Sequence, residues 1–140
     1  MTLLPEGVVA VVTSSGILKH AFHVAYVPFR TTVNQDLKAL VVKDGISSRY
    51  VFHALQDYAE DIRKLTKKQG GTVDSLDIQR VLEYEIPVPA LDVQKLMVDV
   101  VDNFEAICSE SQMCLPAEIE ARKKQYTYYR NKILTFESVK

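Results

Sequence analysis

The chain has 140 residues, a length that suits one domain or one small domain with a helical appendage. Hydrophobic residues make up 47% and charged residues 25%, as in an ordinary folded protein. The formal net charge of −1 excludes a strongly basic DNA-binding domain, although a local cationic patch would still suffice to bind DNA.

No apolar stretch approaches the roughly 20 residues that a membrane helix needs. Residues 1–7 lack the basic and apolar blocks of a signal peptide, so we expect a cytoplasmic protein. Cys108 and Cys114 are too few for a disulfide framework, and no histidine lies near them in sequence. We interpret both as small apolar residues in a reducing compartment.

Residues 7–42 have the pattern of strands. Val8–Val12 is a short run rich in β-branched residues, which is typical of a buried strand. Ser14-Ser15-Gly16 then predicts a turn, and Asn34-Gln35-Asp36 interrupts the apolar pattern before it resumes over residues 37–42.

A helix is predicted over residues 48–66, capped by Ser47 or Ser48. Its expected buried stripe has helical spacing and consists of Val51, Ala54, Leu55, Tyr58, Ile62 and Leu65. A short capped turn of helix is expected over residues 75–80, and residues 83–89 indicate an edge strand or an extended exit from the domain.

From residue 91 the apolar period changes to that of helices. One predicted seam consists of Val93, Met97, Val100, Phe104 and Ile107. A second helix begins near Pro116 and carries the seam Ile119, Arg122, Tyr126, Tyr129, Ile133 and Phe136. These seams could pack on their own domain, but little chain follows, so we expect a partner helix. The predicted fold is α+β, with a small mixed domain followed by a long, coiled-coil-like helical tail.

Motifs of catalysis are scarce in this sequence. Gly70-Gly71-Thr72 is not part of a phosphate-binding loop, and no nucleophile elbow is present. His20 and His23 would point to opposite faces of a strand, and His53 stands alone on a predicted helix, so we interpret all three as ordinary polar residues. The sequence therefore predicts a binding protein without catalytic residues, bound metal or cofactor.

Two stretches resemble the DNA-specificity subunits of type I restriction–modification systems. Gly71-Thr72, followed by Asp77-Ile78 and Ile86-Pro87-Val88-Pro89, is similar to the end of a target-recognition domain in that family. The run Leu115-Pro116-Ala117-Glu118-Ile119, continued by Gln125-Tyr126-Thr127-Tyr128-Tyr129-Arg130, resembles the family's long spacer helix. Together the resemblance covers nearly the whole chain.

The resemblance implies a non-catalytic role in DNA recognition and assembly. A full subunit of this family carries two target-recognition domains, each reading half of a split DNA sequence, and conserved helices that bind modification subunits. Methylation, cleavage and S-adenosylmethionine belong to the partner subunits. Residues 1–90 would then form a partial target-recognition domain, shorter than is usual in the family, and residues 91–140 the helical spacer and dimerisation region. The alternative is a truncated half-subunit that only dimerises or binds partners, and a solitary enzyme is a third hypothesis.

Candidate DNA contacts lie in the predicted loops, where side chains can reach grooves and phosphates. They are Ser14, Ser15, Lys19, Asn34, Gln35, Lys67, Lys68, Gln69 and Thr72. Each is alternatively a polar turn residue or a lysine on a solvated helix end.

The seam of the second helix is expected to form an antiparallel homodimer, as two copies of this helix lie side by side in the family. Residues flanking the seam are expected to contact modification subunits; these are Gln125, Tyr128 and Arg130. Tyr128 could instead pack inside the helical pair.

Overall fold

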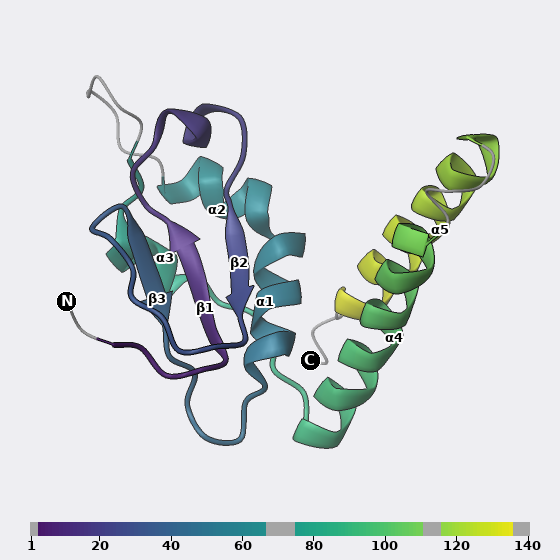
Figure 1. Ribbon diagram of the computed structural model, residues 1–140, viewed down its shortest axis with the longest axis horizontal. Coiled ribbons are helices and arrows are strands. Elements are labelled where there is room, and N and C mark those ends of the chain that lie inside the picture. The colour runs from purple at the N-terminus through teal and green to yellow at the C-terminus, as the bar shows by residue number, and fades with distance from the viewer. Residues whose placement is uncertain (1–2, 67–74, 111–115, 136–140) are drawn as a thin grey trace, which may run out of the picture. The chain divides into compact units, whose positions relative to one another are not determined.

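A computed structural model describes residues 3–66, 75–110 and 116–135 of the chain (Figure 1). The chain divides into two compact units, Met1–Ile86 and Pro87–Lys140. The first unit combines a sheet with helices and the second is helical, so the predicted α+β class is confirmed. None of the helices within the described ranges has the length and apolar character that crossing a bilayer requires.

The first unit is built on a three-stranded antiparallel sheet of order β2-β1-β3. The central strand β1 (Val8–Val12) pairs with β2 (Val24–Val27) and with β3 (Leu37–Leu40). A 3-10 turn, η1 (Gly16–Lys19), follows β1, where the sequence predicted a turn. The continuous apolar run of β1 is explained by its central position, because Val8 and Val9 point to opposite faces of the sheet and both are buried.

Helix α1 (Ser48–Asp57) packs on β1 and β2, and is followed by α2 (Ala59–Thr66) and α3 (Ile78–Glu83). The predicted cap is confirmed, since the Ser47 hydroxyl accepts a hydrogen bond from the Tyr50 backbone N–H at 3.3 Å. The single helix predicted over residues 48–66 is wrong, because the chain bends at Tyr58 between α1 and α2. The Tyr58 ring packs on Tyr84, with ring centroids 5.8 Å apart.

The core lies between the sheet and the helices. Its buried members are Val9, Val11, Leu18, Phe22, Phe52, Leu55, Ile62, Leu76 and Val81. The predicted place of Leu65 in this core is wrong, because Leu65 is 61% exposed and Thr66 is 1% exposed. The bend at Tyr58 changes which side of α2 faces the core, and the buried Thr66 hydroxyl donates a hydrogen bond to the Ile62 carbonyl at 2.6 Å.

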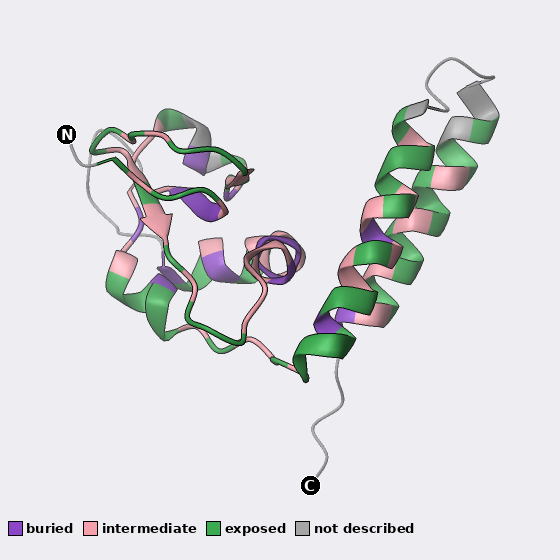
Figure 2. Ribbon diagram, turned by 60° about the horizontal axis from the view of Figure 1, so that its bottom comes forward, coloured by how far each residue is buried: buried purple, intermediate pink, exposed green. Residues whose placement is uncertain are grey.

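The second unit is a helical hairpin in which α4 (Leu91–Glu110) packs against α5 (Pro116–Leu134), as Figures 1 and 2 show. Residues 84–90 leave α3 without forming a further strand, so the extended exit is the correct one of the two predicted alternatives. The buried side chain of Gln94 secures the first turn of α4, because its amide donates a hydrogen bond to the Pro89 carbonyl at 2.8 Å.

Candidate nucleic-acid interface and assembly helices

The carboxyl end of β1 brings two predicted contact segments together. Thr13, just after β1, donates hydrogen bonds to the Asp36 carbonyl from its backbone N–H at 2.8 Å and from its hydroxyl at 3.2 Å. The turn that begins with Ser14 and Ser15 therefore lies beside the segment that contains Asn34 and Gln35.

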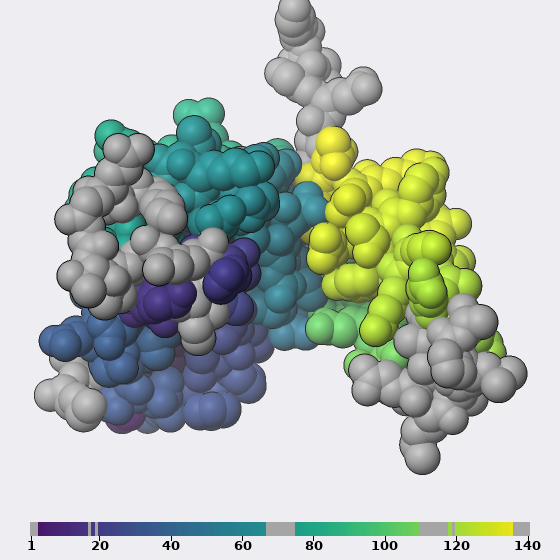
Figure 3. Space-filling model, turned by 90° about the horizontal axis from the view of Figure 1, so that it is seen from above, coloured from purple at the N-terminus to yellow at the C-terminus, as the bar shows by residue number. Residues whose placement is uncertain are grey.

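A third segment meets the other two at this end of the sheet. Ser14 forms an isolated antiparallel bridge with Ser75, and the Leu76 N–H donates to the Thr13 carbonyl at 2.9 Å. The Asp77 N–H donates to the Thr66 carbonyl at 2.9 Å, so the described residues on either side of 67–74 are joined at the same place. Figure 3 views the first unit from this end, with η1 in purple and α2 in teal.

The side chains at this meeting point are polar. Asn34 and Gln35 are exposed, whereas Ser14 and Ser15 are half-buried. The Asn34 carboxamide oxygen accepts a hydrogen bond from the Asp36 N–H at 3.2 Å, an Asx turn that fixes the loop before β3. An amide and hydroxyls can each donate and accept hydrogen bonds, as contacts to base edges require.

Lys67, Lys68, Gln69 and Thr72 lie outside the described residues, and of Lys19 only the backbone, in η1, is described.

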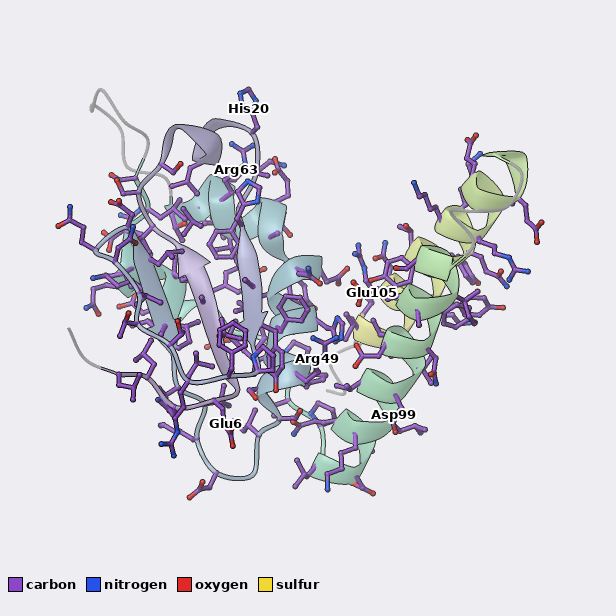
Figure 4. All side chains as sticks on the ribbon, in the orientation of Figure 1. Glu6, His20, Arg49, Arg63, Asp99 and Glu105 are labelled. Atoms are coloured by element: carbon purple, nitrogen blue, oxygen red, sulfur yellow. The ribbon has the colours of Figure 1, made fainter. Side chains whose placement is uncertain are left out.

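Arginines stand near the same end of the first unit, on α2 and α3. Arg63, labelled in Figure 4, pairs with Glu60 through two hydrogen bonds of 2.7 and 3.0 Å. The hydrogen bond from Arg63 is the main cause that lowers the pKa of Glu60. Arg80 donates to the Leu65 carbonyl at 3.5 Å. Arg80 and Ser75 lie at this end of the unit as well and were not among the predicted contacts, although both follow the Gly70-Gly71-Thr72 stretch closely in sequence.

In the second unit, the predicted seam of α5 faces α4 of the same chain. The Tyr129 ring stacks on Phe104 with centroids 5.5 Å apart and an angle of 15° between the ring planes. Closer to the loop, the Cys108 thiol lies 3.8 Å from the Arg122 carbonyl oxygen. Tyr126 and Ile133 are half-buried. The side chain of Ile119 and the whole of Phe136 lie outside the described residues.

The predicted seam of α4 is displaced from the side that is actually buried. Gln94 and Val101 are buried, while Val93 and Ile107, both placed in the seam by their spacing, are exposed. Apolar residues cover a wide arc of α4, so spacing alone did not identify the side that meets α5.

The predicted partner contacts on α5 differ in their surroundings. Gln125 and Tyr128 are exposed, and Tyr128 lies edge-on to Tyr129 with the Lys132 ammonium 5.8 Å from its ring centre. The Arg130 guanidinium is half-buried and lies 5.5 Å from the centre of the Tyr126 ring. Burial raises the pKa of Tyr126, and Arg130 acts in the opposite direction.

Comparison with known proteins identifies the class. Residues 3–121 match the family described as the type I restriction modification DNA specificity domain. The specificity subunit of the type I restriction enzyme EcoR124I/EcoR124II from Escherichia coli is 35% identical over 134 residues, which cover 96% of this chain and 33% of that protein. The specificity subunit of the Escherichia coli enzyme EcoprrI is 31% identical, covering 96% of this chain and 35% of its own.

A Mycoplasma pneumoniae relative, the specificity subunit of the type I restriction enzyme MpnII, is 43% identical over 54 residues, 38% of this chain and 16% of that protein. The chain belongs to the type I restriction–modification DNA specificity family. It spans about a third of the length of the two Escherichia coli relatives.

Proposed function

We propose that this chain is a non-catalytic DNA sequence-recognition and assembly component of a type I restriction–modification complex in the cytoplasm. The observation that carries the proposal is the family match over residues 3–121, which covers the first unit almost completely and the second unit as far as the first turns of α5. Methylation and cleavage would be carried out by modification and restriction subunits, and the chain itself would hold no cofactor.

DNA would be contacted at the carboxyl end of β1. The convergence of the segments around Ser14, Asn34 and Ser75 supports this assignment, because a compact polar surface made of three loops can follow a groove. Lys67 and Lys68 belong to the segment that begins and ends there, and we assign them to phosphate contacts. Ser15, Lys19, Gln35, Gln69 and Thr72 complete the proposed contact set.

The helical hairpin would provide the assembly surface. We assign to it coiled-coil-like docking of modification subunits, with Gln125, Tyr128 and Arg130 as contacts, and association with a second copy through the C-terminal helix. The exposure of Gln125 and Tyr128 supports this role.

The test is the affinity of the full chain for duplex DNA across a salt series. Each phosphate contact contributes about 0.9 to the slope of log affinity against log salt, so replacing Lys67 and Lys68 together with alanine should lower the slope by up to about 2. A matched control replaces Lys123 and Lys124 on α5, the same change of charge in the other unit.

An unchanged slope in the first variant, or an equal change in the control, would reject the assignment of these lysines. Absence of any DNA binding, together with capture of a modification subunit, would instead support the hypothesis of a pure interaction module. Sequencing of the sites methylated by the reconstituted complex would then identify the target.

A further inference from the structure

The loop that joins β1 to β2 is fixed by backbone hydrogen bonds. The Val12 N–H donates to the His23 carbonyl at 3.1 Å, which closes the loop where it leaves the sheet. Further out, the Leu18 N–H donates to the Ser15 carbonyl at 3.1 Å within the turn that leads into η1. The course of residues 13–23 is therefore set by bonds that do not use the exposed side chains of the loop.

Two buried side chains anchor this loop on either side of His20. Leu18 is 1% exposed and Phe22 is 6% exposed, and both belong to the core between the sheet and the helices. His20 lies between these anchors and is exposed. Its imidazole makes no hydrogen bond, ion pair or ring contact with another residue of the described part of the chain. Figure 4 shows the His20 side chain at the outer end of the first unit, pointing away from the sheet.

His20 lies at the end of the sheet where the candidate DNA contacts converge. Its loop begins at Thr13, whose N–H donates to the Asp36 carbonyl and whose carbonyl accepts from the Leu76 N–H. The loop therefore leaves the sheet beside the segment that contains the exposed Asn34 and Gln35. A duplex that contacts those two side chains would also meet the outer end of this loop.

We propose that His20 is a base-reading residue of this chain. Its imidazole N–H donates to an acceptor on a base edge in the major groove, such as O6 or N7 of guanine. Because Leu18 and Phe22 hold the loop in place, little backbone freedom is lost on binding, and the hydrogen bond adds to affinity without a large ordering cost. The inference rests on the proposed DNA-recognition function and adds a specificity-determining residue to it, a role that the spacing of His20 and His23 did not indicate.

The test selects sequences from a library of duplexes with a randomised central segment, using the full chain assembled with its modification subunits. His20→Ala is compared with the wild type and with a matched control, His23→Ala. His23 is exposed as well, but it lies at the base of the loop, where its carbonyl bonds to Val12.

In the selected sequences, His20→Ala should relax the preference at one base pair and leave the other positions as in the wild type. Affinity for the sequence that the wild type prefers should fall about tenfold, as expected for the loss of one base contact. Affinity for a scrambled duplex and the slope of log affinity against log salt should stay the same, because no phosphate contact is lost. His23→Ala should change none of these quantities.

A His20→Ala variant that selects the wild-type sequence with wild-type affinity would overturn the inference and leave the proposed function intact. An equal loss of affinity on all duplexes, with a lower salt slope, would also overturn it, because it would show a phosphate contact. The same holds for a lower midpoint of denaturant unfolding in His20→Ala, which would show that the ring supports the fold. A wild-type complex that selects no sequence would instead reject the proposed function itself.

Discussion

The stacked rings of Phe104 and Tyr129 allow a direct measurement of whether the α5 seam packs against α4 of the same chain. Their centroids are 5.5 Å apart and their planes differ by 15°, the geometry of a stacked aromatic pair. Such a pair contributes about 0.5–1.5 kcal/mol beyond the area it buries. In a double-mutant cycle with Phe104→Leu and Tyr129→Leu, we expect a coupling free energy of about 1 kcal/mol.

The assay is urea unfolding followed by circular dichroism, at two protein concentrations a hundredfold apart. Because both rings belong to the same hairpin, the coupling should not change with concentration. The control cycle combines Phe104→Leu with Tyr128→Leu, since Tyr128 is exposed and contacts Tyr129 edge-on, and these two effects should add within about 0.5 kcal/mol. A coupling below about 0.3 kcal/mol, or one that appears only at high concentration, would refute an intrachain seam.

Three further predictions concern the first unit. Gly7 and Gly45 have φ of 75° and 82°, so Gly7→Ala and Gly45→Ala should each lower the free energy of unfolding by about 1–2 kcal/mol in a denaturant titration, whereas Gly16→Ala should not. Thr66→Val should cost about 1 kcal/mol by removing the buried hydrogen bond to the Ile62 carbonyl, and an unchanged midpoint would contradict that role. Burial raises the pKa of Tyr50 from 10.0 to about 12, which favours the neutral phenol in the folded state. The contribution of Tyr50 to the free energy of unfolding should therefore be fully present below pH 10.0 and should be lost as the pH rises through about 12. A free energy of unfolding that does not change over this alkaline range would refute the prediction.

Local signals predicted much of the fold because their causes are local. The β-branched run of β1 indicates a buried strand from the residue types of the strand itself. Ser47 caps α1 through a bond to a residue only three positions away, and the cap could therefore be assigned from sequence. The helical periods after residue 91 likewise predicted α4 and α5.

The bend at Tyr58 could not be predicted because its packing partner is distant in sequence. Tyr58 contacts Tyr84, which follows α3, and helical spacing within residues 48–66 contains no information about that ring. The misplacement of Leu65 follows from the same cause, since a uniform helical period was extended across the bend. Thr66 is buried in place of Leu65, and this could not be predicted because threonine is polar and is usually exposed.

The α4 seam was assigned correctly at Phe104, which stacks on Tyr129, and wrongly at Val93 and Ile107, which are exposed. Leu96, Val93 and Val101 point in different directions around the helix, so a hydrophobic period fits more than one side. A single seam was predicted for α4, whereas α4 presents one side to α5 and leaves other apolar residues, such as Leu96, exposed. A helix with two apolar sides is expected where it contacts two neighbours, as in a bundle.

In the candidate DNA-contacting surface, most of the groups that hold the segments together are not the side chains that we propose to contact DNA. The three segments at the end of β1 are joined mainly through backbone groups, by Thr13 with Asp36 and Leu76, and by Thr66 with Asp77. Replacing the exposed Gln35 side chain should therefore alter sequence preference with little effect on stability. Asn34 differs, because its side chain also closes the Asx turn, and its replacement should change both properties. If these loops contact DNA as proposed, an exchange of their side chains would change the target sequence while the backbone bonds that assemble the surface remain the same.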